Sequence, residues 1–151
     1  MTTIKRTNSE DSHFQEMVTF LNKDLLDRYG DLQDYYSQFN TIQNLPTVVV
    51  AYINEEAVGC GCFKKYDDTS VEVKRMYVAP EYRGKGIGGA ILAELEQWAT
   101  ELNIGVLVLE TGTNQPEAIH LYKKMGYNII PNYGQYSGMD TSICMEKKLT
   151  Q

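Results

Sequence analysis

One stretch, residues 71–99, constrains the fold of this 151-residue chain more than any other. It reads VEVKRMYVAPEYRGKGIGGAILAELEQWA, and its first part alternates as a β-strand rich in β-branched and aromatic residues does. One face of that strand carries Val71, Val73 and Tyr77, and the other face carries Glu72, Lys74 and Met76. From residue 87 on, apolar residues recur at helical spacing, namely Ile87, Ile91, Leu95, Trp98 and Leu102. The stretch therefore predicts a strand, a turn and an amphipathic α-helix in direct succession.

A glycine-rich turn joins this strand to this helix. It comprises Arg83, Gly84, Lys85, Gly86, Ile87, Gly88 and Gly89. A turn that opens a helix leaves the first backbone N–H groups without partners, and the helix dipole adds partial positive charge there. Glycines let an anion approach the backbone closely because no side chain stands in the way. The turn is therefore predicted to bind a phosphate or pyrophosphate group.

Two motifs of the chain resemble those of the GCN5-related N-acetyltransferase (GNAT) family. The first, Arg83-x-x-Gly86-x-Gly88, lies between the predicted strand and helix and is similar to the family's acetyl-coenzyme A signature. The second, residues 118–127 (AIHLYKKMGY), is similar to the family's A-I-x-L-Y-x-K-x-G-F/Y. The motifs stand in the family's order with family-like spacing. Together with the strands around them, they cover most of the chain after residue 46.

The resemblance implies a fold and a cosubstrate. The fold is α/β (α+β), a mixed and mainly antiparallel sheet with helices on both faces, in a single domain over residues 1–151. The cosubstrate is acetyl-coenzyme A (acetyl-CoA), and no metal is implied. Its pyrophosphate would lie on the glycine-rich turn, and its pantetheine arm along the strand edge formed by Met76, Tyr77 and Val78. The backbone N–H of Met76 or Val78 would also polarise the thioester carbonyl.

The resemblance also implies catalytic residues. Glu72 lies eleven residues before Arg83, where the family's histone acetyltransferase branch has its base glutamate. Alternatively, Glu72 pairs with Lys74 on the same strand face and is structural or binds the substrate. Tyr122 matches the family tyrosine near the coenzyme sulfur, which can protonate the departing thiolate. The alternative for Tyr122 is an ordinary aromatic residue on an apolar helix face.

The remaining site candidates concern coenzyme A and the acceptor, which is predicted to be a primary amine on a small molecule or peptide. The family often has an Asn seven residues before the tyrosine, and here Gln115 takes that place with Asn114 beside it. Glu110 either binds the acceptor ammonium or caps the loop after it. In the region that borders the family's acceptor site, the candidates are Asp31, Gln33, Tyr35 and Tyr36. A later loop that would close over the acceptor carries Tyr133, Tyr136 and Ser137.

Charge and cysteine usage argue against several kinds of partner. The formal net charge is −6 and no basic run exists, which argues against nucleic acid or an anionic membrane. The longest apolar run is too short to span a bilayer and the polar start is no signal peptide, so we expect a cytoplasmic protein. Cys60, Cys62 and Cys144 suggest neither a disulfide framework nor a zinc site, and we expect free thiols. Dimers are common in the family, so the resemblance is compatible with a homodimer.

Periodicity and turn residues predict the other elements. Strands are expected at residues 2–7, 45–53, 57–66, 105–110, 127–130 and 142–148, with loops at residues 111–115 and 131–140. Helices are expected at residues 10–29 and 31–39, and from Pro116 to a stop at Gly126. His13 and His120 are expected to be solvent-facing.

Two other function classes fit part of the same pattern. Gly84-x-Gly86-x-x-Gly89 satisfies the dinucleotide-binding pattern, and Glu110 falls about where a ribose-binding acid stands, as in an oxidoreductase. Against this, residues 79–83 separate the strand from the first glycine, and antiparallel strands are predicted before it. The second alternative is a non-catalytic protein that binds acyl-CoA as a sensor or partner subunit. The presence of both Glu72 and Tyr122 argues against it.

Overall fold

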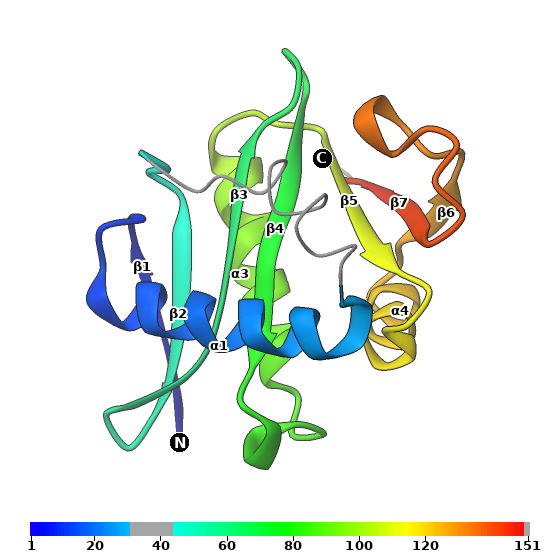
Figure 1. The fold of residues 1–151 in the computed structure, drawn as a ribbon. Coiled ribbons are helices and arrows are strands. Elements are labelled where there is room, and N and C mark those ends of the chain that lie inside the picture. Colours follow the sequence, from blue (N-terminus) through cyan, green and yellow to red (C-terminus); the bar gives the residue numbers. More distant parts are fainter. Residues whose placement is uncertain (31–43, 150–151) are drawn as a thin grey trace.

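The described residues form a seven-stranded sheet with the strand order β1-β2-β3-β4-β5-β7-β6 (Figure 1). The structure is a computed structural model that describes residues 1–30 and 44–149. Its strands are β1 (Thr2–Thr7), β2 (Val48–Ile53), β3 (Glu56–Lys65), β4 (Ser70–Val78), β5 (Val106–Gly112), β6 (Asn128–Ile130) and β7 (Ser142–Lys148). Neighbouring strands pair antiparallel, except for the parallel pair β4 and β5. The sheet is therefore mixed and mainly antiparallel, as predicted.

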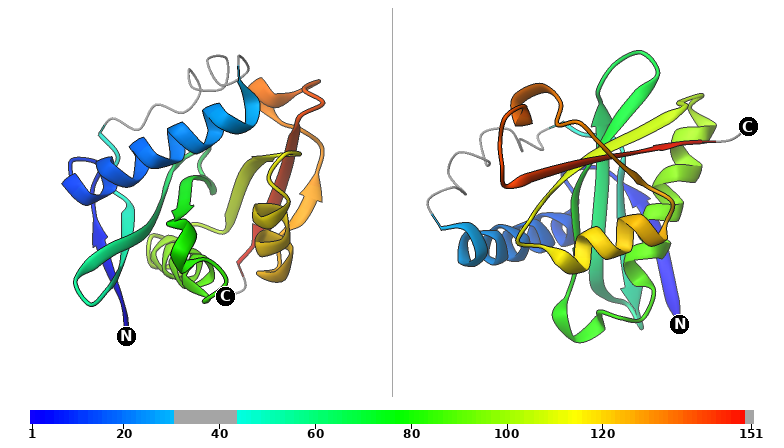
Figure 2. Two further views of the ribbon diagram at one scale, coloured as in Figure 1. Left: turned by 60° about the horizontal axis from the view of Figure 1, so that its bottom comes forward. Right: turned by 90° about the vertical axis from the view of Figure 1, so that its right-hand side faces the viewer.

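Helices cover both faces of this sheet. They are α1 (Ser12–Tyr29), α3 (Ile87–Glu101) and α4 (Pro116–Lys124). Helix α1 lies across one face, and α3 and α4 lie on the other (Figure 2). The side chain of Asp11 begins α1 by accepting a hydrogen bond from the N–H of Phe14 at 3.0 Å, and Gly30 ends it with a φ of 57°. The predicted fold class is thus confirmed on both counts, the sheet and its covering helices.

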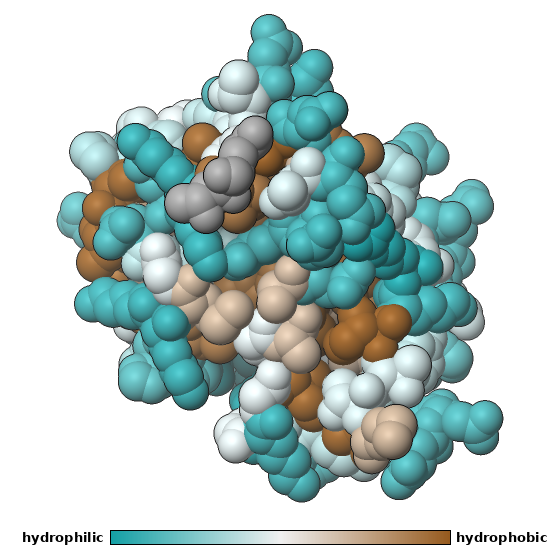
Figure 3. All heavy atoms as spheres, turned by 180° about the vertical axis from the view of Figure 1, so that it is seen from behind, coloured by the Kyte–Doolittle hydropathy of each residue, from teal (hydrophilic) through white to brown (hydrophobic). Residues whose placement is uncertain are grey.

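The two faces of the sheet bury different side chains. Under α3 and α4 lies the larger cluster, which includes Val49, Val58, Phe63, Val71, Val73, Ile91, Leu92, Leu95, Leu107, Leu109, Tyr122 and Tyr127. Under α1 lies a second cluster with Phe14, Met17, Val18, Leu21, Val48, Val50, Cys60, Cys62 and Tyr77. Seen from the side of α3, the surface is mostly hydrophilic, with hydrophobic residues in separate areas (Figure 3). Helix α3 packs on the sheet with one face, which buries Ile87, Ile91, Leu92, Leu95 and Ala99.

A β-bulge interrupts β4 at Arg75. Arg75 has a φ of 58°, and the pairing with β3 shifts there. Tyr77 opposes Cys60, but Lys74 opposes Cys62, so β4 has one more residue than β3 between these pairs.

The bulge changes which side chains of β4 share a face. Val71 and Val73 belong to the cluster under α3, and Met76 and Val78 pack against the same cluster. Tyr77 instead belongs to the cluster under α1. The prediction that Tyr77 shares a face with Val71 and Val73 is wrong, because the extra residue reverses the alternation after the bulge.

Strands β4 and β5 stop pairing before either of them ends. Their partners run from Ser70 with Val106 to Val73 with Leu109, whereas β4 continues to Val78 and β5 to Gly112. Beyond this point the two strands diverge (Figure 1). The gap leaves room for side chains from both strands, and the candidate site lies there.

The predicted boundaries differ from the observed ones in a few places. Strand β5 includes Thr111 and Gly112, which were expected in a loop, because both still pair with β7. Leu102 is 50% exposed, contrary to prediction, since α3 ends at Glu101. The hairpin between β2 and β3 turns at Asn54 and Glu55, both with positive φ as a two-residue turn of this kind requires.

Several other expectations are settled by the structure. The three cysteines are free and buried, and His13 and His120 are exposed. In residues 1–30 and 44–149, no helix is both long and apolar enough to cross a membrane. The predicted helix at residues 31–39 and its candidates Asp31, Gln33, Tyr35 and Tyr36 lie outside the described residues.

Candidate active site

A groove of about 720 Å³ lies between the end of β4, the turn that opens α3, and α4. This volume is in the range of cofactor-sized ligands. The predicted cofactor-binding residues that line it are Met76, Tyr77, Val78, Arg83, Gly84, Gly86, Ile87, Gly88, Gly89 and Gln115. The structure therefore brings most of these candidates together.

Two cofactor candidates do not line the groove. The ammonium group of Lys85 lies 5.6 Å from the centre of the Tyr82 ring. The backbone carbonyl of Asn114 accepts a hydrogen bond from Arg28 of α1 at 3.0 Å. Between the neighbouring residues Asn114 and Gln115, Gln115 is the one that lines the groove.

The glycine-rich turn has the geometry of an anion-binding site. Gly84 and Gly86 have φ values of 78° and 83°, which favour glycine, and a Cβ at either position would meet open space. Gly86 is the N-cap of α3, and no side chain caps the helix. The first-turn N–H groups of α3 therefore remain available to a ligand. The residues present fit the pyrophosphate of a coenzyme.

Arg83 folds back on β4. Its Nε donates to the carbonyl of Val78 at 2.8 Å, and its guanidinium lies 5.7 Å from the centre of the Tyr77 ring. The guanidinium thus fixes the turn against the end of β4 and adds positive charge beside the groove.

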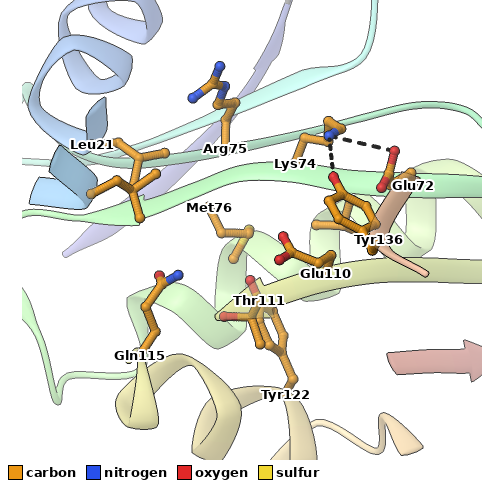
Figure 4. A pocket seen from close by; sticks show the side chains of 12 residues that line it. Leu21, Glu72, Lys74, Arg75, Met76, Glu110, Thr111, Gln115, Tyr122 and Tyr136 are labelled. Atoms are coloured by element: carbon orange, nitrogen blue, oxygen red, sulfur yellow. Dashed lines mark hydrogen bonds and ion pairs between the residues drawn. The ribbon is translucent and has the colours of Figure 1, made fainter. Parts of the chain in front are cut away.

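A smaller pocket of about 90 Å³ adjoins the groove in the gap between β4 and β5 (Figure 4). Its polar and charged lining residues are Glu72, Lys74, Arg75, Glu110, Thr111, Gln115, Tyr122 and Tyr136. The groove and the pocket share Leu21, Met76, Gln115 and Tyr122. Tyr122 therefore lies at the junction between the two spaces.

Glu72 belongs to a buried network at the base of this pocket. The hydroxyl of Tyr133 donates to its Oε2 at 2.7 Å, and Nζ of Lys74 lies 3.7 Å from its Oε1. Lys74 also donates to the hydroxyl of Tyr136 at 3.3 Å (Figure 4). Burial lowers the pKa of Lys74 and raises the pKa of Tyr133. The expected pairing of Glu72 with Lys74 is present, and both oxygens of Glu72 are engaged.

Glu110 is the first residue of β5 beyond its last pair with β4. Its carboxylate projects into the gap between the strands (Figure 4). Burial raises the pKa of Glu110 to about 7; the charge of Glu72 acts in the same direction, and Lys74 and Ser142 act in the opposite one. A carboxylate of this kind changes its protonation state near neutral pH.

Tyr122 reaches into the gap from α4 (Figure 4). Its side chain is buried, and burial together with the charge of Glu110 raises the pKa of the phenol. The hydroxyl makes no hydrogen bond to the residues that the structure describes. The Tyr122 hydroxyl is therefore a neutral hydrogen-bond donor at the junction of groove and pocket, and none of the residues that the structure describes accepts its proton.

The family comparison agrees with this arrangement. The family model described as "Acetyltransferase (GNAT) family" matches residues 14–127. The chain belongs to the GNAT family. Family membership argues against the oxidoreductase alternative, and the antiparallel strands before β4 do the same.

Relatives and solved structures extend this match over nearly the whole chain. IAA acetyltransferase from Azospirillum brasilense is 36% identical over 152 residues, which cover 95% of this chain and 97% of the relative. A Klebsiella pneumoniae structure assigned to the acyl-CoA N-acyltransferases has a TM-score of 0.82 at 30% identity, with 99% of each chain covered. A GNAT acetyltransferase from Elizabethkingia anophelis, solved with acetyl-CoA bound, has a TM-score of 0.69 at 22% identity and 98% coverage of both chains. This last likeness shows the fold.

The loop between β6 and β7 contributes more to this GNAT site than the sequence indicates. Tyr133 and Tyr136 were predicted only to close over an acceptor, but they contact Glu72 and Lys74. Ser137 is exposed and donates to the carbonyl of Asn132. The Nδ2 of Asn132 lies within 3.1 Å of three carbonyl oxygens, those of Tyr136 and Met139 in the same loop and of Ser142 at the start of β7. Sequence reasoning missed Asn132, because no local pattern marks such a contact.

Arg28 was missed as well. Its guanidinium binds the carbonyl of Asn114 and forms ion pairs with Glu117 of α4 and Asp24 of α1. These contacts tie the end of α1 to the loop between β5 and α4, beside Gln115. The only sequence signal for Arg28 is its place in the last turn of a helix. A basic residue there is favourable in any helix because of the helix dipole, so it does not mark a site.

Proposed function

We propose that this GNAT chain transfers the acetyl group of acetyl-CoA to a primary amine by direct attack, without a covalent enzyme intermediate. One observation carries the proposal: a groove with an anion-binding turn adjoins a small pocket with two carboxylates, and Tyr122 lies at their junction. A groove for the donor and a pocket for the acceptor must meet where the reacting atoms meet.

The glycine-rich turn and β4 would bind the acetyl donor. The first-turn amides of α3, with Gly84, Gly86 and Gly88, would hold the pyrophosphate. The backbone of Met76, Tyr77 and Val78 would hold the pantetheine arm, and the N–H of Met76 or Val78 would polarise the thioester carbonyl. These groups are in place because β4 has no partner on the β5 side beyond Val73. When bound, acetyl-CoA supplies an activated acetyl group on a good leaving group.

Side chains in the gap between β4 and β5 would carry out the proton transfers. Tyr122 would give its phenolic proton to the departing thiolate, which its neutral state permits. A carboxylate, either the family-predicted Glu72 or Glu110, would take the proton of the acceptor ammonium directly or through a water. A buried carboxylate attracts a cation, which favours an amine as the acceptor.

Ligand titration tests the donor assignment. We would titrate the purified protein with acetyl-CoA in a calorimeter and repeat the titration with NADH. Saturable binding of acetyl-CoA alone is the expected result. Binding of NADH alone would overturn the transferase proposal and make Glu110 a candidate ribose ligand.

An acceptor panel tests the reaction itself. Thiol release from acetyl-CoA would be followed with L-lysine, spermidine, phenethylamine, an aminoglycoside and a short peptide with a free N-terminus. IAA would be included because the Azospirillum relative is named an IAA acetyltransferase. At least one amine should increase thiol release and yield an acetylated product. Tight acetyl-CoA binding without turnover of any amine would favour the alternative of a non-catalytic acyl-CoA-binding protein.

A further inference from the structure

The two carboxylates of the pocket lie in different surroundings. Glu72 is 2% exposed and is held on both oxygens, by the Tyr133 hydroxyl and by Lys74. The partners of a carboxylate in such a network stabilise its charged form, and protonation would weaken its attraction to them.

Glu110 has the access that Glu72 lacks. It is only partly buried, and its carboxylate points into the gap where β4 and β5 have separated (Figure 4). It is also the carboxylate whose charge acts on the pKa of Tyr122, whereas Glu72 is not among the causes of that shift. Glu110 is therefore the carboxylate whose charge acts on the residue at the junction of groove and pocket.

We propose that Glu110, rather than Glu72, accepts the proton of the acceptor ammonium. This inference rests on the proposed function. Glu110 takes one proton and leaves a neutral amine, whose nitrogen forms the new bond to the acetyl carbonyl carbon as the carbon–sulfur bond breaks. Tyr122 gives its proton to the sulfur and regains one from the acylated nitrogen. The proton on Glu110 passes to solvent, so that one proton is released per turnover.

The groups around Glu110 suit this role. They are Glu72 and Lys74 from β4, Tyr122 from α4, Tyr136 from the loop between β6 and β7, and Cys144 and Ser142 from β7. Burial holds the pKa of Glu110 at about 7, so the carboxylate is a stronger base than an exposed glutamate and is still ionised in part at neutral pH. Lys74 limits the rise in pKa by its positive charge. Glu72 and Lys74 thus serve as a fixed charge pair beside the base.

The kinetic test compares Glu110→Gln with the matched change Glu72→Gln. With the best amine of the panel and saturating acetyl-CoA, kcat/KM of the wild type should fall with decreasing pH through an apparent pKa near 7. Glu110→Gln should lower kcat/KM by about 100-fold or more and remove this acid limb. Glu72→Gln should keep the limb. If Glu110→Gln keeps both rate and limb while Glu72→Gln loses them, the base is Glu72.

A stability measurement tests the inference without any acceptor. Because the folded pKa of Glu110 lies above its unfolded value, its contribution to stability is present below about pH 4.5 and is lost as the pH rises through about 7. Relative to Glu110→Gln, the folding equilibrium constant of the wild type should therefore fall by roughly 70-fold between pH 5 and pH 8.

The two measurements separate the possible failures. If no amine of the panel reacts, the proposed function fails, but urea unfolding still shows whether Glu110 titrates near neutrality. A difference between wild type and Glu110→Gln that does not change with pH would overturn the base assignment. A pH-dependent difference with a shared midpoint in kinetics and unfolding supports it.

Discussion

The two faces of β4 are built on opposite principles, although they share one strand. On the α3 side, Val71 and Val73 pack with Leu95 in a closed apolar cluster. On the other side, Glu72 and Lys74 are equally buried but bind each other and the tyrosines of the loop between β6 and β7. One face removes apolar surface from water, and the other buries polar groups that must find partners.

The comparison teaches where the stability and the chemistry of this GNAT chain reside. Burial of apolar side chains favours folding without constraining chemistry. A buried carboxylate beside a lysine costs desolvation and is weak support for stability, but it gives shifted pKa values at a cavity. The apolar face should therefore dominate unfolding measurements, and the polar face should dominate activity measurements.

The largest expected effect is on the apolar face. Leu95→Ala removes a fully buried side chain from the cluster under α3 and leaves a cavity, so it should lower the free energy of unfolding by about 2–5 kcal/mol. Leu102→Ala, just beyond the end of the same helix, is the control, because Leu102 is 50% exposed. Urea unfolding measures both. Equal losses for the two variants would show that the cluster under α3 is not the main source of stability.

The next effect separates chemistry from stability within the cluster under α3 and α4, by a matched pair of tyrosines. Tyr122 and Tyr127 contact each other edge to face with ring centres 5.9 Å apart, but only the Tyr127 hydroxyl has a described acceptor, Glu96 at 3.0 Å. Tyr122→Phe should lower turnover by about 100-fold, with acetyl-CoA binding preserved. Tyr127→Phe should preserve turnover and lower the free energy of unfolding by about 1 kcal/mol through the lost hydrogen bond.

Steady-state kinetics, calorimetry and urea unfolding of both variants check this pair. Full activity of Tyr122→Phe would remove the proposed acid. A large loss of turnover in Tyr127→Phe would mean that the region around Tyr122 acts through packing rather than through one hydroxyl.

The sequence predicts the fold well where the signal is local. The pattern from β4 through the glycine-rich turn to α3 is visible in the alternation, the glycines and the helical spacing, and Ile87 begins the helix as expected. The bulge at Arg75 has no such signal, because a non-glycine residue with a positive φ is rare and depends on the pairing with β3. Long-range pairing also extends β5 through Thr111 and Gly112.

The candidate site shows the same limit. The motif predicts most residues of the groove, since they are contiguous in the sequence. The contacts of Tyr133 with Glu72 and of Tyr136 with Lys74 join residues 61 and 62 positions apart, which no spacing rule indicates. The difference between Glu72 and Glu110 depends on where β4 and β5 separate, and that is a property of the sheet.

A smaller effect than those of Leu95→Ala and Tyr122→Phe is expected where the Tyr133 hydroxyl binds Glu72 on the polar face. Tyr133→Phe removes the hydroxyl that donates to Oε2 of Glu72 at 2.7 Å and keeps the ring. The carboxylate is buried, so the unmade bond should cost about 1–2 kcal/mol of the free energy of unfolding at pH 7. Tyr66→Phe is the control, because the Tyr66 ring packs edge to face on Tyr133 at 5.1 Å and its hydroxyl bonds to no described residue. If urea unfolding shows the same small change for both, the hydroxyl of Tyr133 does not stabilise Glu72, and the polar face depends on Lys74 alone. If only Tyr133→Phe loses stability while turnover is kept, Glu72 is a structural charge. This is the outcome expected if Glu110 is the base.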